Sequence, residues 1–432
     1  MKKIAFLTLG CKVNQYETNG MIQSFKDNGY EIVDFENFAD IYVVNTCTVT
    51  NMSDRKSRQV LRQARKNNKD AIVIAVGCYA QVAKEELEKI PEIDFVLGTN
   101  EKINIVKYVE QYLNQKQSQE FNIEIDDVMQ NKEYGDFGSV TYTEKTRAVI
   151  KVQDGCDRFC SYCIIPYARG RVRSRKPENV INEIKEIAKT GIKEVVITGI
   201  HVASYGKDFK EEYRLIDLLE EINKIDGIER IRLGSIEPLL ITEEFVSRLE
   251  KLEKICHHFH LSLQSGCTET LKRMNRRYTT EEFEEIVNRL RKCYKDVILT
   301  TDIIVGFPDE SDEEFETTYE FLKKIKFYKM HVFKYSPRKG TKAEEMKNQI
   351  PGDVKEIRSK RLLELSDNNE NEYLNSYINK NVEVLFEENE GEYYKGHTPN
   401  YIMVKFKTKE NLENKIKEIT ITGKEELCLI SE

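Results

Sequence analysis

The stretch AVIKVQDGCDRFCSYCIIPYARGRVRSR, residues 148–175, carries three cysteines directly after an apolar, strand-like run. Cys156, Cys160 and Cys163 follow the spacing C-x3-C-x2-C. Three thiolates at this spacing can bind three irons of a four-iron cluster and leave the fourth iron open to a small molecule. A structural zinc site would need four protein ligands, and zinc modules usually pair two C-x2-C knuckles, whereas this stretch has one. The motif therefore predicts an iron–sulfur site.

From this motif onward the chain alternates strand-like and helix-like segments six times, as far as residue 334. Such alternation is typical of parallel strands joined by crossover helices, and six units predict an incomplete barrel. The expected strands are residues 149–152, 195–199, 229–234, 258–263, 297–305 and 329–334. In these barrels the carboxyl ends of the strands carry the chemistry. The runs found there are TGIHVASYG (198–206), GSIEP (234–238), SLQSG (262–266) and VGFPDE (305–310).

Three further cysteines, Cys11, Cys47 and Cys78, end the apolar runs KIAFLTLGC, DIYVVNTC and AIVIAVGC. Amphipathic stretches separate these runs, at residues 17–28, 53–67 and 81–90. This pattern predicts parallel strands that are buried on both faces. Because the carboxyl ends of neighbouring parallel strands meet at one edge of a sheet, the three thiols could meet there. Each could instead be a small buried side chain, as most lone cysteines are, but their equivalent positions favour a second cluster.

The composition limits the class of protein. The 432-residue chain, long enough for two or three domains, has 67 Lys and Arg against 74 Asp and Glu. The net charge of −7 argues against a protein that coats nucleic acid through bulk charge. No apolar run approaches the roughly 18 residues of a membrane span, and the run at 4–9 is shorter than the roughly 7–15 residues of an export signal. We therefore expect a cytoplasmic protein, with no membrane partner, in which the grouped members of the ten cysteines serve metal binding or redox chemistry rather than disulfides.

Cations gather in three places although the net charge is negative. Residues 55–69 carry seven Lys or Arg and no acid, on the helix expected after Cys47. The other two places are 169–176, which includes Arg169, Arg171, Arg173 and Arg175, and 272–277. Clusters of one sign beside an active site favour a polyanionic partner, because Arg makes bidentate contacts to phosphate.

Residues 371–432 consist of short alternating strands separated by polar turns, as in a small antiparallel barrel. Residues 378–432 carry 8 Lys or Arg against 11 Asp or Glu, which gives a net charge of −3. RNA binding by this module would therefore depend on Tyr393, Tyr394 and Tyr401 as stacking faces, together with local lysines. The alternative is a module that only braces the barrel.

These features together resemble the radical S-adenosylmethionine (SAM) superfamily, whose motif is C-x3-C-x-aromatic-C, with Tyr162 in the aromatic position. The upstream cysteines resemble those of its methylthiotransferase branch, and the resemblance covers essentially the whole chain. It implies the α/β class, with a flavodoxin-like N-terminal parallel-sheet domain, a partial (β/α)6 radical SAM barrel and a small antiparallel, TRAM-like β-barrel. The expected limits are 1–113 for the first domain, 114–141 for a linker, 142–370 for the barrel and 371–432 for the last module.

The resemblance also implies the cofactors, which are SAM and two [4Fe–4S] clusters. The expected cluster ligands are Cys156, Cys160 and Cys163 for one cluster and Cys11, Cys47 and Cys78 for the other. Residues expected at the SAM site are Tyr162, Gly199 near the methionyl amino group, Gln264 near the ribose hydroxyls and Gly306 near the adenine. Each glycine could instead only end a strand with a turn. No catalytic residue is assigned beyond the cluster ligands, and Cys256, Cys267, Cys293 and Cys428 are expected to be structural thiols.

The implied reaction is methylthiolation of C2 of an adenine in the anticodon loop of tRNA. One SAM would supply the methyl group and another a 5′-deoxyadenosyl radical, with reduced flavodoxin or a ferredoxin-type protein as electron donor. The runs GIHVASYG (199–206) and RLGSIEP (232–238) most resemble enzymes that act on N6-threonylcarbamoyladenosine next to the anticodon. The alternatives are isopentenyladenosine in tRNA, a ribosomal-protein aspartate, and a non-catalytic iron–sulfur protein that binds RNA.

Overall fold

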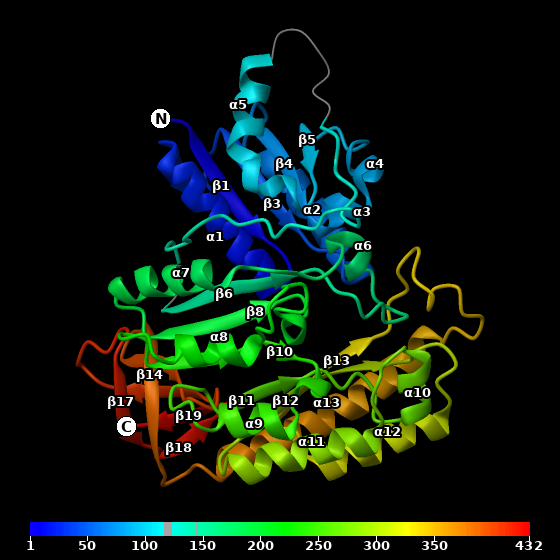
Figure 1. Ribbon diagram of the computed structural model, residues 1–432, viewed down its shortest axis with the longest axis vertical. Coiled ribbons are helices and arrows are strands. Elements are labelled where there is room, and N and C mark those ends of the chain that lie inside the picture. Colours follow the sequence, from blue (N-terminus) through cyan, green and yellow to red (C-terminus); the bar gives the residue numbers. More distant parts are fainter. Residues whose placement is uncertain (116–122, 144–145) are drawn as a thin grey trace.

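The structure is a computed structural model that describes residues 1–115, 123–143 and 146–432. Part of the linker expected at 114–141 therefore lies outside the described residues. Figure 1 shows the N-terminal sheet at one end of the long axis, the barrel strands and helices toward the other end, and the C-terminal sheet beside the barrel. The limits between the domains stay predictions.

The N-terminal domain is a parallel sheet of five strands in the order β2-β1-β3-β4-β5. Every residue of β3 (Ile41–Thr46) and β4 (Ile72–Gly77) is buried, which is why both appear in the sequence as continuous apolar runs. The other strands are β1 (Lys3–Thr8), β2 (Glu31–Val33) and β5 (Phe95–Leu97). The helices are α1 (Lys12–Asp27), α2 (Asn51–Asn67), α3 (Cys78–Val82), α4 (Lys84–Leu87) and α5 (Ile105–Gln115). The expected parallel sheet is confirmed.

One helix of this domain differs from the expectation. The single helix expected at 81–90 is wrong, since the structure has two short helices, α3 and α4. The chain leaves the helical conformation at Ala83, where φ is −136° and ψ is 37°. Helix α3 begins at Cys78, directly after β4, so this cysteine is held between a buried strand and a helix.

The barrel consists of two four-stranded sheets, in the orders β7-β6-β8-β9 and β10-β11-β12-β13. An isolated parallel bridge joins Ile231 of the first sheet to Ile255, which precedes the first residue of β11. The strands are β6 (Arg147–Asp154), β7 (Arg173–Ser174), β8 (Glu194–Gly199), β9 (Arg230–Leu233), β10 (Ser235–Ile236), β11 (His258–Leu261), β12 (Ile298–Val305) and β13 (Lys329–Lys334). Only β7, beside β6, pairs antiparallel among these described strands. The six expected strands are all present, and the sequence missed the two-residue strands β7 and β10.

Helices α7 to α13 cover the outside of the barrel. They are α7 (Pro177–Lys189), α8 (Leu215–Ile222), α9 (Glu243–Leu249), α10 (Thr268–Arg273), α11 (Thr280–Cys293), α12 (Asp312–Ile325) and α13 (Gly352–Asn375). The short helix α6 (Ile165–Arg169) lies instead beside α3 of the N-terminal domain. Helices α11 and α12 begin with capping boxes, Thr279 with Glu282 and Ser311 with Glu314, which satisfy the free N–H groups of the first turn. One large apolar core joins the strands to these helices.

The C-terminal module is a six-stranded sheet in the order β17-β14-β15-β16-β19-β18. Its strands are β14 (Asn381–Glu390), β15 (Tyr393–His397), β16 (Met403–Lys407), β17 (Ile416–Thr420), β18 (Gly423–Glu425) and β19 (Cys428–Ser431). The pairs are antiparallel, as expected, apart from β16 with β19, which is parallel. The loop between β15 and β16 is bound to the barrel, because Arg232 donates to the Pro399 carbonyl (3.0 Å) and Asn400 donates to the Asp296 carbonyl (3.1 Å). The module therefore braces the barrel.

Buried charges join the N-terminal domain to the barrel. Glu17 of α1 is ion-paired with Lys102, with Arg169 of α6 and, at 2.8 Å, with Lys151 of β6. Lys151 also pairs with Asp154 at 2.6 Å. The side chains of this ion network, Glu17, Lys102, Lys151, Asp154 and Arg169, are at most 7% exposed. Buried charges are tolerated only when paired in this way.

We expect this network to make the domain contact sensitive to acid. Burial raises the pKa of Glu17, but the charges of Arg169, Lys102 and Lys151 outweigh it and hold the pKa well below its usual value. The unfolded chain has the ordinary pKa of about 4.3, so ionised Glu17 stabilises the fold above that pH and its contribution is lost as the pH falls below it. The loss should be about 1.4 kcal/mol for each pH unit below about 4.3.

Urea unfolding at several pH values would measure this loss. The wild-type free energy of unfolding should fall more steeply below about pH 4.3 than that of Glu17→Gln, which has no charge to lose. If the free energy of unfolding falls equally steeply with pH in both proteins, ionised Glu17 does not stabilise the domain contact.

Candidate functional site

The first cysteine trio lies at the carboxyl edge of three adjacent strands. Cys11 precedes α1, and Cys47 and Cys78 follow β3 and β4 directly. Gly10 shows how close two of these segments are, because a Cβ added there would lie 2.9 Å from the Cβ and Sγ atoms of Cys47. Gly10 also has φ of +100°, which favours glycine. The sheet thus brings together cysteines that are far apart in the sequence.

The protonation of this trio follows from its surroundings. Burial raises the pKa of Cys47 to about 11, and the neighbouring thiols of Cys78 and Cys11 contribute to this rise. A metal must therefore displace protons from these thiols when it binds. Arg169 supplies a compensating charge, because its Nε donates to Cys78 Sγ at 3.2 Å.

The second trio lies in the loop between β6 and α6. The loop starts at Gly155, where φ is +71° and an added Cβ would lie 1.8 Å from the Arg171 carbonyl oxygen, so that only glycine fits. A tight turn follows, in which the Cys163 N–H donates to the Cys160 carbonyl at 3.0 Å. Burial raises the pKa of Cys156 to about 11 and that of Cys163 to about 12.

Hydrogen bonds to sulfur identify residues that the sequence analysis missed. The Arg158 N–H donates to Cys156 Sγ at 3.5 Å, and Arg276 Nη1 donates to Cys160 Sγ at 3.4 Å. Arg276 is held in place because Nη2 donates to the Ser262 carbonyl at 3.1 Å. Its sequence signal is the cation run at 272–277, which predicts a polyanionic partner rather than a contact to sulfur.

The donor atoms of both trios fit iron–sulfur clusters. A four-iron cluster binds each thiolate through a different iron, and three thiolates leave the fourth iron open. Each trio offers only sulfur ligands, and arginine N–H groups point at the sulfurs, which is the hydrogen bonding that tunes such clusters.

The residues expected at the SAM site lie at the carboxyl edge of the barrel. Gly199 ends β8, and an added Cβ there would lie 2.9 Å from Gln153 Oε1. Gln264 follows β11 with φ of +74°, and Gly306 follows β12 with φ of +69°. Tyr162 packs against a small apolar cluster that includes Met274, Phe307 and Tyr335. The three positions Gly199, Gln264 and Gly306 thus lie at the ends of barrel strands, as the second trio does after β6. The contacts of all four residues with SAM stay a prediction.

The expectation that the arginine run at 169–175 contacts a polyanion such as RNA is wrong for three of its four arginines. Arg169, Arg173 and Arg175 are only 0%, 2% and 1% exposed, because carboxylates inside the protein neutralise them. Arg171 is different, since its side chain is 54% exposed. The run belongs to the domain contact rather than to a surface.

The same expectation for the cation run at 272–277 is wrong for two of its four cations. Arg273 is paired with Glu314, and Arg276 lies against the second trio. Lys272 and Arg277 are exposed. Of the tyrosines expected to stack on bases, Tyr394 is 8% exposed and belongs to the core of the C-terminal module, so it too is wrong as a surface contact.

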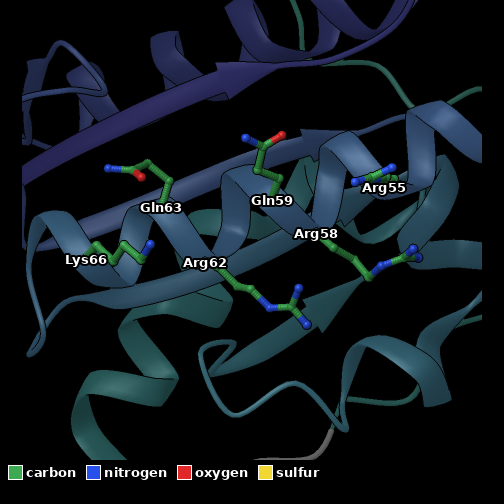
Figure 2. Close-up of a pocket in the computed structure, with 6 residues that line it drawn as sticks. All are labelled: Arg55, Arg58, Gln59, Arg62, Gln63 and Lys66. Atoms are coloured by element: carbon green, nitrogen blue, oxygen red, sulfur yellow. The ribbon is translucent and has the colours of Figure 1, made fainter.

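The cation run on α2 does lie on the surface. Figure 2 shows Arg55, Arg58, Arg62 and Lys66 along one helix, together with Gln59 and Gln63, and these six residues line a shallow pocket of about 550 Å³. Spacings of three and four residues place them on one face. Within the described part of the chain, Arg58 is the one of these cations with an ion-pair partner, Glu86 at 2.9 Å. The face therefore offers unneutralised positive charge.

The open parallel barrel, with three thiols in the loop after its first strand, defines a radical SAM enzyme. The profile described as Radical SAM superfamily matches residues 150–322, and that of Uncharacterized protein family UPF0004 matches residues 3–98. The chain is 44% identical over 427 residues to Threonylcarbamoyladenosine tRNA methylthiotransferase MtaB of Bacillus subtilis (strain 168), covering 98% of this chain and 94% of that relative. It belongs to the radical SAM tRNA methylthiotransferase family, and it is a methylthio-transferring enzyme that uses SAM and [4Fe–4S] clusters.

Other relatives agree with this family. The tRNA-2-methylthio-N(6)-dimethylallyladenosine synthase of Clostridium novyi (strain NT) is 35% identical over 442 residues, covering 100% of this chain and 96% of that relative. Among solved structures, the radical S-adenosylmethionine methyltransferase TsrM of Kitasatospora setae matches with a TM-score of 0.57 at 16% identity, covering 77% of this chain and 73% of that chain. This likeness confirms the expected fold. Over the described residues, the helices are too short or too polar to span a bilayer.

Proposed function

We propose that this enzyme methylthiolates C2 of N6-threonylcarbamoyladenosine next to the anticodon of tRNA. The observation that carries the proposal is the pair of cysteine trios, each at the carboxyl edge of a parallel sheet and linked through Arg169, which contacts Cys78 and lies on the helix after the second trio. The choice of base is supported by relatives in Bacillus subtilis and Aquifex aeolicus (strain VF5) that bear the threonylcarbamoyladenosine name at 44% identity. Relatives named for dimethylallyladenosine are 35% to 38% identical.

The chain's own residues have distinct tasks in this proposal. Cys156, Cys160 and Cys163 would hold one cluster and leave an iron open for SAM, and the N-terminal trio would hold the other. The bound cofactors supply the radical chemistry and the sulfur. The protein holds both sites near one base, and Arg276 and Arg169 bring positive charge to one sulfur of each trio. The buried network around Glu17 fixes the two domains relative to each other.

The proposal is tested by anaerobic reconstitution followed by mass spectrometry of tRNA nucleosides. With SAM and a reduced flavodoxin or ferredoxin-type donor, tRNA that contains threonylcarbamoyladenosine should gain its 2-methylthio derivative. Methylthiolation of isopentenyladenosine alone would favour the first alternative, and modification of a ribosomal-protein aspartate without RNA the second. SAM cleavage that is absent on reduction would favour a non-catalytic RNA-binding protein.

We expect the face of α2 to bind the tRNA backbone. The double variant Arg62→Glu, Lys66→Glu should weaken tRNA binding about tenfold and reduce the salt dependence of the binding constant by about two units of slope, because two phosphate contacts are lost. The measurement is equilibrium binding of tRNA at several salt concentrations.

A matched control is the double variant Lys323→Glu, Lys324→Glu on α12, which Figure 1 places at the end of the molecule away from α2. These two exposed lysines should be replaceable without change in the salt slope. If the control and the α2 variant weaken tRNA binding equally, only net charge matters. The assignment of the α2 face as the tRNA contact would then be wrong.

A further inference from the structure

A cavity of about 790 Å³ lies between strands β11 to β13 of the barrel and the C-terminal module. Four of the chain's six histidines line it: His258, His260, His331 and His397. Lys12 of α1 reaches it from the N-terminal domain. All three domains therefore contribute to one polar cavity, and its volume is in the range of small-ligand sites.

A chain of hydrogen bonds on the cavity wall ends at an atom without a partner. His260 Nε2 lies 3.1 Å from Asp302 Oδ2, and its Nδ1 lies 2.9 Å from Thr300 Oγ1. The same hydroxyl lies 3.1 Å from His258 Nε2. His258 is 7% exposed, and its Nδ1 has no hydrogen-bond partner within the described residues. A buried polar atom without a hydrogen bond destabilises the fold unless a ligand supplies the missing bond. A ligand hydroxyl can donate or accept, so it suits either tautomer of the ring.

Lys12 is the unpaired cation of this cavity. The other lysines that line it are paired with carboxylates: Lys329 with Glu370, Lys395 with Glu390 and Lys405 with Glu425. The Lys12 ammonium has no ion pair or hydrogen bond to any part of the chain that the structure describes. Burial lowers the pKa of His258 and His331, and the charge of Lys12 adds a smaller effect in the same direction. The cavity is therefore lined by an unpaired ammonium group and by an imidazole nitrogen without a hydrogen-bond partner.

The C-terminal module makes the wall beside Lys12 rigid. Tyr401 stacks on His397, with ring centroids 4.7 Å apart, and the guanidinium groups of Arg147 and Arg232 lie 5.1 and 4.6 Å from its ring centre. Its φ of +73° is uncommon for a residue other than glycine, and such strain persists where the surroundings fix it. The two arginines add positive charge at this end of the cavity, partly balanced by Glu387 and Glu194.

We propose that this cavity binds the threonyl part of the substituted adenine, with its carboxylate on Lys12 and its hydroxyl on His258. The inference rests on the proposed function and names the residues that select the substrate. A threonylcarbamoyl group carries one carboxylate and one hydroxyl, which complement an unpaired ammonium and an unpartnered imidazole nitrogen, whereas an isopentenyl group has neither. Lys12 directly follows Cys11. Because N1 of adenine lies between C2 and C6, and C6 carries N6, a substituent on N6 that is bound beside Cys11 keeps the C2 edge near the first trio.

Synthetic anticodon stem-loops test the carboxylate contact. One RNA carries threonylcarbamoyladenosine and a second carries its methyl ester, which has no charge. Wild-type enzyme should bind and modify the ester about 30-fold less well, because the attraction between the carboxylate and the Lys12 ammonium is lost. In the Lys12→Gln variant, binding and modification of the RNA with the free carboxylate should fall to the values for the ester RNA. Those for the ester RNA should be unchanged. Equilibrium binding without reductant gives a readout that does not depend on turnover, and iron content shows whether the cluster beside Cys11 is retained.

The control is Lys405→Gln, which removes a lysine of the same cavity that is already paired. It should keep the preference for the acid. If Lys12→Gln loses iron, His258→Phe serves as the second variant, tested with an RNA in which 2-aminobutyrate replaces threonine. Its defect should be seen with the threonyl RNA and be absent with the aminobutyryl RNA.

The two hypotheses fail in different ways. Wild-type enzyme that modifies the acid and the ester equally, or a Lys12→Gln variant that keeps full preference for the acid, overturns this inference and leaves the proposed function intact. Wild-type enzyme that is inactive on threonylcarbamoyladenosine and active on isopentenyladenosine overturns the proposed function and the inference with it.

Discussion

Replacing Cys160 by alanine should abolish both SAM cleavage and methylthiolation, whereas replacing Cys47 should abolish methylthiolation alone. Cys160 lies in the loop after β6, and Cys47 lies at the edge of the other parallel sheet, so each change removes a ligand of one trio. Either variant should lose about four irons per chain, because two remaining thiolates do not hold a cluster. The measurements are iron content, 5′-deoxyadenosine formed on reduction, and methylthio nucleoside by mass spectrometry.

Cys267→Ser is the control for this experiment. Cys267 is 7% exposed and precedes α10 in the barrel, and we expect it to be a structural thiol. Its replacement should leave iron content and both activities unchanged. Iron loss in Cys267→Ser would show that the ligand set is incomplete, and loss of SAM cleavage in Cys47→Ala with the barrel cluster intact would refute the separate roles of the two trios.

The strands and the cysteine positions could be predicted from the sequence because both depend on local patterns. Strands β3 and β4 are buried along their whole length, so each gives an unbroken apolar run, and the cysteine that follows is then placed by sheet geometry. Cys11, Cys47 and Cys78 could therefore be grouped without any contact information. Strands β7 and β10, with two residues each, give no such pattern.

The role of the arginines could not be predicted because their partners are distant in sequence. Arg169 is paired with Glu17, 152 positions away, and Arg175 donates to the hydroxyl of Tyr16 in the N-terminal domain, 159 positions away. A run of cations looks the same in sequence whether it faces solvent or buried carboxylates. The charges on α2 were predicted correctly as surface charges because that helix has a clear apolar face, with Val60, Leu61 and Ala64 buried. Lys12 was missed because a single lysine after a cysteine carries no pattern.

Replacing Arg169 by lysine should uncouple the N-terminal domain from the barrel. The Arg169 side chain is fully buried and makes contacts in several directions at once: to Cys78 Sγ at 3.2 Å, to Asn14 Oδ1 at 2.6 Å, and to the carboxylates of Glu17 and Asp154. A lysine has one ammonium group and lacks the planar fork that spans these acceptors. The variant should lose about 3–5 kcal/mol of stability, as breaking a buried charge network typically does.

The functional effect should be specific to one cluster. Without the guanidinium beside Cys78, the N-terminal trio should lose its iron, so methylthiolation should disappear while the barrel still cleaves SAM. Urea unfolding, iron content and the two product assays measure these effects. Arg171→Lys is the matched control, since the neighbouring Arg171 is 54% exposed and should be replaceable without consequence. An Arg169→Lys protein with wild-type stability and full iron would show that the buried network does not hold the two cluster sites together.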